Sequence, residues 1–269
     1  MRNLILLLTL LLAASWACGE DFLTLVQTGS PEQVQAAIAQ GAKVDVRDKD
    51  GGTPLMLAAK FNKDPKVITV LLKAGAKIDD RDQDGSTPLM CAADNTSNPE
   101  IIATLVKAGA KVDDRDKKDI VPLSYAAWCN QNPEVITALL KAGAIVNDRD
   151  KEGNTPLLYA AWNNSNPMVI TVLLAAGAKI DERDKNGNTP LIYAAVYNKN
   201  PEIIATLLQA GAKIDDRDKD GVTPLIGAAK SMFPEVITLL LKAGAKVDER
   251  DKGGKPPLAY AAYCNPIPR

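Results

Sequence analysis

TPLLYAAWNNSNPMVITVLLAAG, residues 155–177, is one copy of a pattern that recurs along the 269-residue chain. The prolines of its Thr-Pro-Leu tripeptide stand at 54, 88, 156, 190 and 224, and the degenerate copies Val-Pro-Leu and Pro-Pro-Leu add prolines at 122 and 257. The step is 34 residues and shrinks to 33 only at the last copy. A period of this length predicts a solenoid, in which each unit buries its apolar side against its neighbours.

Each unit predicts two short helices. Thr155 can accept a hydrogen bond from a free backbone N–H at a helix start, and Pro156 fits the first helical position. Asn166-Pro167 repeats this signal and opens a second helix, Met168 to Ala176. Apolar residues fall on one side of both helices, at Leu157, Ala160, Ala161, Val169, Ile170, Leu173 and Leu174. Gly177 ends the second helix, and the polar stretch 178–187 predicts a hairpin finger leading to the next unit.

This order of a turn, a TPLxxAA helix, a second helix and an Asp-rich finger resembles the ankyrin repeat. The resemblance covers Asp21 to about Asn265 and implies an all-α fold, an ankyrin-repeat solenoid of stacked helix-turn-helix units with hairpin fingers. Most units carry one extra residue before the second helix. The family's usual histidine after Thr-Pro-Leu is absent, and its place is taken by Met56, Met90, Ser124, Leu158, Ile192, Ile226 and Ala259.

The chain divides into four parts on this basis. We expect a signal peptide over 1–17, an N-terminal capping repeat over 18–50, six ankyrin-type repeats over 51–252 and an incomplete C-terminal repeat over 253–269. Arg2, the apolar run Leu4 to Ala14 and the small residues Ser15 and Ala17 indicate export. Cleavage after Ala17 would leave Cys18 first, which looks like a bacterial lipoprotein signal, but plain secretion uses the same bond. The sequence therefore predicts an exported protein that is periplasmic, an outer membrane lipoprotein or secreted, with membrane contact only through a lipid on Cys18.

Composition argues against nucleic-acid binding and against catalysis. The chain has 32 Lys plus Arg and 33 Asp plus Glu, without the basic excess of a nucleic-acid binder. It contains no histidine, which removes the commonest general base and His-activated nucleophiles. We therefore expect no enzyme, no catalytic residue and no cofactor.

One acidic pattern must be weighed as a calcium loop. Asp80 to Gly85 and Asp216 to Gly221 match its first half, with oxygens at alternate residues. The twelfth position, where a bidentate glutamate is needed, is Cys91 in one loop and Gly227 in the other. Turn formation explains these aspartates better, and we expect no metal site.

Aromatic residues mark the candidate binding face. Outside residues 1–17, every tyrosine and tryptophan falls in a first helix, in pairs three or four residues apart. In the ankyrin family the residues after the Ala-Ala pair vary and typically touch partners from the concave face. We expect this face to bind a protein or peptide, with Trp128 and Trp162 as anchors whose truncation to alanine costs about 2 kcal/mol or more of binding energy. The full candidate set is Phe61, Tyr125, Trp128, Tyr159, Trp162, Tyr193, Tyr197 and Tyr263.

Two alternatives stay open at this stage. The tyrosines directly before Ala-Ala, namely Tyr125, Tyr159, Tyr193 and Tyr260, also fit core packing. The whole solenoid also fits a structural spacer or scaffold of the cell envelope that has no dedicated ligand. One finger stands apart, since Asp119 replaces the turn glycine and we expect Ile120 beside it to be exposed.

Overall fold

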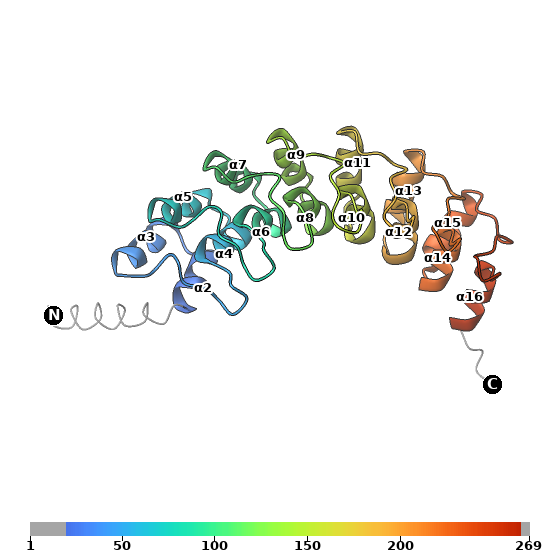
Figure 1. Ribbon diagram of the computed structural model, residues 1–269, viewed down its shortest axis with the longest axis horizontal. Coiled ribbons are helices and arrows are strands. Elements are labelled where there is room, and N and C mark those ends of the chain that lie inside the picture. The colour runs from blue at the N-terminus through green and yellow to red at the C-terminus, as the bar shows by residue number, and fades with distance from the viewer. Residues whose placement is uncertain (1–19, 265–269) are drawn as a thin grey trace. The chain divides into compact units, whose positions relative to one another are not determined.

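The computed structural model describes residues 20–264, with the side chains of 21–262 (Figure 1). These residues form two compact units. The first unit runs to Pro122 and includes Thr137–Ala144. The second consists of Leu123–Ile136 and the chain from Ile145 onward. Within the described residues all regular secondary structure is α-helical, which confirms the predicted fold class.

The helices alternate between a first and a second helix of each repeat, as the 34-residue period predicts. The first helices are α2 (Glu20–Thr28), α4 (Pro54–Phe61), α6 (Pro88–Asn95), α8 (Pro122–Cys129), α10 (Pro156–Asn163), α12 (Pro190–Tyr197), α14 (Pro224–Ser231) and α16 (Pro257–Cys264). The second helices are α3 (Pro31–Ala39), α5 (Pro65–Lys73), α7 (Pro99–Lys107), α9 (Pro133–Lys141), α11 (Pro167–Ala175), α13 (Pro201–Gln209) and α15 (Pro234–Lys242).

Helix boundaries follow the predicted caps. Thr155 accepts a hydrogen bond from the backbone N–H of Leu158 and Pro156 is the first residue of α10. Asn166 accepts the N–H of Met168 at 3.0 Å and so opens α11. Gly177 follows that helix with φ of 92°, a backbone conformation that glycine adopts without strain. These local signals therefore set where both helices of the repeat start and stop.

Helices of the same kind pack side by side within each unit. In the first unit α2, α4 and α6 lie next to one another, as do α3, α5 and α7. In the second unit the neighbours are α10, α12, α14 and α16 on one side, and α11, α13 and α15 on the other. The expected core residues Leu157, Val169, Ile170 and Leu173 are at most 1% exposed. Burial of such a side chain stabilises the fold by about 1.5 to 3 kcal/mol.

An aspartate holds the turn of a finger, and within each unit an arginine ties one finger to the next. Asp184 Oδ1 accepts the backbone N–H groups of Asn186 at 2.9 Å and Asn188 at 2.7 Å. Arg183 donates from Nη1 to the carbonyls of Gly187 and Arg217 at 2.7 and 2.8 Å, and from Nη2 to Asp216 at 2.6 Å. Arg47, Arg81, Arg149 and Arg217 make equivalent bridges. The repeated acids and arginines therefore stiffen the row of fingers.

The finger around Asp119 departs from one expectation. Asp119 takes φ of 64°, the left-handed region that glycine occupies in the other fingers. Ile120 is 5% exposed, so the expectation of an exposed isoleucine is wrong. The residue at this position lies beneath the finger in several repeats, and Ser86 and Val222 are buried there too.

The sixth repeat is the one that lacks the extra residue before its second helix. Met232 turns the chain with φ of 53°, and α15 begins after Phe233 without a side-chain cap. After this repeat α16 packs on α14, and Leu258 on α16 is 75% exposed. Equivalent leucines in earlier repeats, such as Leu225, are buried.

Candidate functional site

Five aromatic rings in the second unit form one continuous cluster, which we name the aromatic row. Its members are Trp128 on α8, Tyr159 and Trp162 on α10, and Tyr193 and Tyr197 on α12. Ring centroids of neighbours lie between 5.3 Å, for Trp162 and Tyr193, and 6.2 Å, for Tyr159 and Trp162. Separations of this size are favourable for tilted and offset-stacked aromatic pairs. Trp162 contacts the other four rings and is the centre of the row.

Helical spacing brings these rings together. Tyr159 and Trp162 are three residues apart on α10, and Tyr193 and Tyr197 are four apart on α12, so each pair shares one helix side. Because α10 and α12 pack side by side, the two pairs meet. The sequence predicted this contiguous stripe, and the ring contacts are observed.

Tyrosine hydroxyl groups join first helices to the fingers. Tyr159 Oη lies 2.5 Å from Asp150 Oδ2, and Tyr193 Oη lies 2.9 Å from Asp184 Oδ2. Tyr260 repeats the contact with Asp251 at 2.5 Å. Burial raises the pKa of Tyr193, and the hydrogen bond to Asp184 raises it further. Tyr193 therefore stays a neutral donor near pH 7, and the three hydrogen bonds fix the rings in place.

The rings of the aromatic row differ in their exposure to solvent. Tyr159 and Tyr193 are 4% and 8% exposed, which fits the core-packing alternative for the residues before Ala-Ala. Trp128 and Trp162 are half-buried, and Tyr197 is 54% exposed. A partner can therefore reach the two tryptophans and Tyr197, while the two buried tyrosines support them from below.

A surface pocket of about 530 Å³ adjoins the row. Trp162 and Tyr197 form its aromatic wall, and the loops that follow α10 and α12 supply Asn163, Ser165, Asn198, Lys199 and Asn200. These loops contain the residue that is inserted relative to the usual ankyrin unit. The insertion thus helps to build the edge of the candidate site.

A ladder of buried asparagines in these loops was not found by sequence reasoning. Asn198 Nδ2 donates to the carbonyls of Ala161 at 3.1 Å and Asn164 at 2.8 Å, and it is 5% exposed. Asn164 and Asn62 bridge to their preceding repeats in the same way. The sequence signal for this ladder is an asparagine that recurs one position after the first helix, at 62, 130, 164 and 198.

The remaining predicted residues lie elsewhere. Tyr125 on α8 is half-buried. Phe61 belongs to the first unit, is 42% exposed and has Lys60 Nζ 5.6 Å from its ring centroid. The predicted roles of Cys18 and of the Tyr263 side chain fall outside the described residues.

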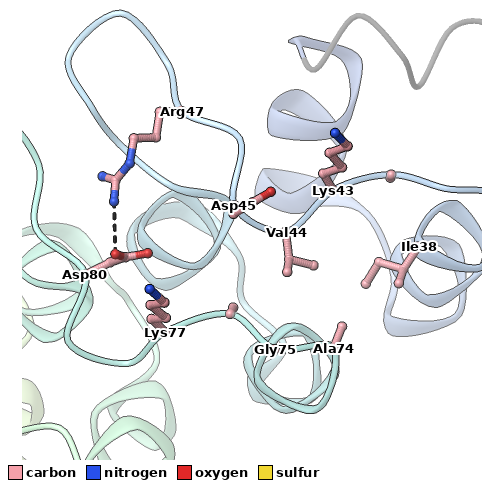
Figure 2. Close-up of a pocket in the computed structure, with 11 residues that line it drawn as sticks. Ile38, Lys43, Val44, Asp45, Arg47, Ala74, Gly75, Lys77 and Asp80 are labelled. Atoms are coloured by element: carbon pink, nitrogen blue, oxygen red, sulfur yellow. Dashed lines mark hydrogen bonds and ion pairs between the residues drawn. The ribbon is translucent and has the colours of Figure 1, made fainter.

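A pocket in the first unit is larger but chemically different. It encloses about 640 Å³ between the starts of two fingers, with Ile38 and Val44 on its apolar side. Figure 2 shows Arg47 reaching Asp80, with the two side chains 2.9 Å apart, and Lys77 beside them. Lysines and aspartates share this wall and no aromatic ring lines it. We therefore place the candidate site at the aromatic row.

Aspartate side chains of the fingers accept hydrogen bonds from backbone N–H groups of their own fingers. Asp82 Oδ1 accepts the N–H groups of Asp84 and Ser86, and Asp218 Oδ1 accepts those of Asp220 and Val222. These are the two loops that matched half of a calcium motif. Among residues 20–264 no group of three acidic or cysteine side chains is arranged to hold a metal ion. In the same range, no helix has the length and apolar character needed to cross a bilayer.

Comparison with known families gives one match. A family model described as ankyrin repeats in three copies matches residues 22–116, 123–218 and 195–268. No curated protein matches the chain. The matched segments include every helix that contributes to the aromatic row.

Proposed function

The chain belongs to the ankyrin-repeat family, and on this premise we propose that it binds a protein or peptide partner through the aromatic row. Ankyrin repeats are in general protein–protein interaction modules and typically have no enzymatic activity. We therefore propose a binding protein that is not an enzyme. The observation that carries the proposal is the unbroken set of ring contacts from Trp128 to Tyr197.

Rigid support makes these rings suitable binding anchors. Tyr159 and Tyr193 hold fixed orientations through their hydrogen bonds to Asp150 and Asp184. Trp162 stacks on both of them and so has few alternative orientations. A side chain that is already ordered loses little entropy on binding, so more of its contact energy appears as affinity. Tryptophan and tyrosine are also the residues that dominate binding hot spots.

The test compares the wild-type chain with the double variant Trp128→Ala and Trp162→Ala. Crosslinking and pull-down from the envelope fraction should capture a partner with the wild type and lose it with the double variant. Far-UV circular dichroism should show that the variant keeps its helices. Met168→Ala is the matched control, because Met168 is 52% exposed on α11, outside the row. A partner retained by the double variant would contradict the proposal and favour a spacer or scaffold role.

We also propose that the protein works outside the cytoplasm. The support is the N-terminal pattern of Arg2, the apolar run from Leu4 and the small residues before Cys18. Mass determination of the mature N-terminus tests this proposal. A diacylglycerol-sized mass on Cys18 indicates a lipoprotein, an unmodified new N-terminus indicates secretion, and an intact Met1 contradicts export.

A further inference from the structure

The pocket beside Trp162 and Tyr197 carries one positive charge and no negative charge. Lys199 is its single charged lining residue, and the lysine is exposed. Among the described residues Lys199 has no ion pair. A ligand group that enters this pocket therefore meets two rings 5.5 Å apart and one ammonium group.

Two of the side-chain amides that line the pocket, those of Asn198 and Asn200, already hydrogen-bond within the fold at both ends. Asn198 Nδ2 bonds to two carbonyls, as described above, and its Oδ1 accepts the N–H of Asn200 at 3.0 Å. Asn200 Nδ2 donates to the carbonyl of Ser165 at 2.8 Å, and its Oδ1 accepts the N–H of Glu202 at 3.0 Å. Among the residues that line the pocket, Lys199 is the one that offers a charge to a ligand.

Lys230 places a second positive charge on α14, at the position that corresponds to Trp162 on α10. Trp128, Trp162, Val196 and Lys230 occupy equivalent places in successive first helices, and α12 packs on α14. Ser231 Oγ donates to the carbonyl of Val196 at 2.6 Å, which joins the ends of these two helices.

Lys230 lies beside the ring of Tyr260. Its Nζ lies 4.7 Å from the ring centroid of Tyr260, and Lys255 Nζ lies 5.6 Å from the same centroid. The one carboxylate held at this ring is Asp251, which accepts the hydroxyl of Tyr260. That hydrogen bond, with a smaller contribution from the charge of Lys230, lowers the pKa of Asp251. Two ammonium groups thus face one carboxylate.

We propose that the segment held by the aromatic row is an acidic peptide. It places an apolar or aromatic side chain in the pocket beside Trp162 and Tyr197 and directs carboxylates toward Lys199 and Lys230. Helix spacing of about 9 Å puts Lys230, two helices beyond Trp162, within about six residues of extended peptide. The aspartates under the row, Asp150 and Asp184, are held by tyrosine hydroxyls, whereas Lys199 and Lys230 are exposed, so charge complementarity to these two lysines favours this partner over a basic or neutral one. The inference rests on the proposed function, since it names the partner chemistry for the same site.

The test pans a random 12-residue peptide display library on the full chain and measures the recovered peptides by fluorescence polarisation. Binders should combine Asp or Glu with Leu, Phe or Trp, and they should lose affinity in Trp162→Ala. In the double variant Lys199→Glu and Lys230→Glu their affinity should fall by about tenfold or more, and it should fall with added salt. Lys213→Glu with Lys242→Glu is the matched control, since both are exposed lysines of the second unit outside the row.

Three results would overturn the inference, and they separate it from the proposed function. If the recovered peptides are neutral or basic and lose affinity in Trp162→Ala, the proposal of an acidic partner is wrong, but the aromatic row still binds peptides. Binders that ignore Trp162→Ala would contradict both. If polyglutamate binds the wild type and Trp162→Ala equally, the lysines attract anions without help from the rings, and the proposed peptide site is wrong.

Discussion

The hydroxyl oxygen of Tyr193 lies 2.9 Å from Asp184 Oδ2, and both side chains are buried. This contact links the first helix α12 to the finger that precedes it. Asp184 also accepts two backbone N–H groups and Asn188 Nδ2, so one carboxylate organises the whole finger. The aromatic row and the finger are therefore parts of one hydrogen-bonded structure.

Tyr193→Phe should lower the free energy of unfolding by about 1.5 kcal/mol at pH 7, because it removes one hydrogen bond to a charged group. The phenylalanine ring keeps the aromatic packing on Trp162, so far-UV circular dichroism should not change. Chemical unfolding of the two proteins measures the difference. Tyr197→Phe is the control, since Tyr197 is 54% exposed and its change should cost little.

The difference in the free energy of unfolding between wild type and Tyr193→Phe should change with pH in the alkaline range. Burial raises the pKa of Tyr193 in the folded chain, so the folded state holds this proton more tightly than the unfolded state does. The resulting stabilisation is complete below the ordinary tyrosine pKa of about 10 and is lost as pH rises toward the folded value. The stability gap should therefore narrow above about pH 10. A constant gap up to strongly alkaline pH would contradict this cause.

Asn198→Ala should destabilise the chain by about 2 to 3 kcal/mol. The substitution leaves the buried carbonyls of Ala161 and Asn164 without their donor, and an unpaired buried polar group is costly. Asn163→Ala is the matched control, because Asn163 is exposed and makes one such bond, to the carbonyl of Trp128. If the two variants unfold at the same denaturant concentration, the asparagine ladder does not stabilise the stack.

The fold was predictable because its signals are local and repeated. A threonine cap, a proline at the first helical position and a closing glycine fix the ends of each helix, as Thr155, Pro156 and Gly177 show. The stripe of rings was also predictable, since equal positions in equal units must align. The residue pattern did not reveal that the side chain of Ile120 is buried. The finger turns this side chain inward, although the turn before it is atypical.

The connections between repeats were harder to foresee. Asn198 reads in the sequence as an ordinary loop residue, and its two bonds reach residues 34 and 37 positions earlier. Tyr193 is buried and Tyr197 is exposed, although the two residues lie only four positions apart on α12. Sequence spacing placed both on the same side but could not rank their exposure.

Asp119→Gly should raise the free energy of unfolding by about 0.5 kcal/mol. Aspartate at φ of 64° is strained by its β carbon, and glycine removes that strain at some cost in unfolded-chain entropy. Gly85→Ala is the opposite case and should destabilise. Its φ is 86°, and the added β carbon would lie 3.2 Å from the backbone nitrogen of Lys117. Urea unfolding of both variants, referenced to wild type, measures the two signs, and equal signs would contradict the strain argument.

Cys91 should react slowly with alkylating agents. Burial raises the pKa of its thiol to about 12, and the thiolate is the reactive form. At pH 8 we expect alkylation at least about 100-fold slower than that of a free cysteine, whose pKa is about 8.5. Peptide mass spectrometry after timed iodoacetamide treatment follows this residue separately from the other cysteines. Labelling should become fast in guanidinium chloride, and fast labelling of the native chain would show that the thiol is not buried.

Arg183→Lys should loosen the contact between two successive fingers. The arginine spans the carbonyls of Gly187 and Arg217 and the carboxylate of Asp216, a forked set that a single ammonium group cannot reproduce. Because the side chain is 39% exposed, we expect a loss of only about 1 kcal/mol. Hydrogen exchange should quicken at the amide of Lys219, which donates to Asn186 across the same two fingers.

Arg250→Lys provides the control for this prediction. Among the described residues Arg250 bonds only to the carbonyl of Gly254 in its own finger, at 2.7 Å, so the same substitution removes no contact between fingers. It should change stability less than Arg183→Lys does and leave exchange at Lys219 unaltered. If both variants lose the same stability, the arginine acts within its own finger, and the bridge to the next finger contributes nothing measurable.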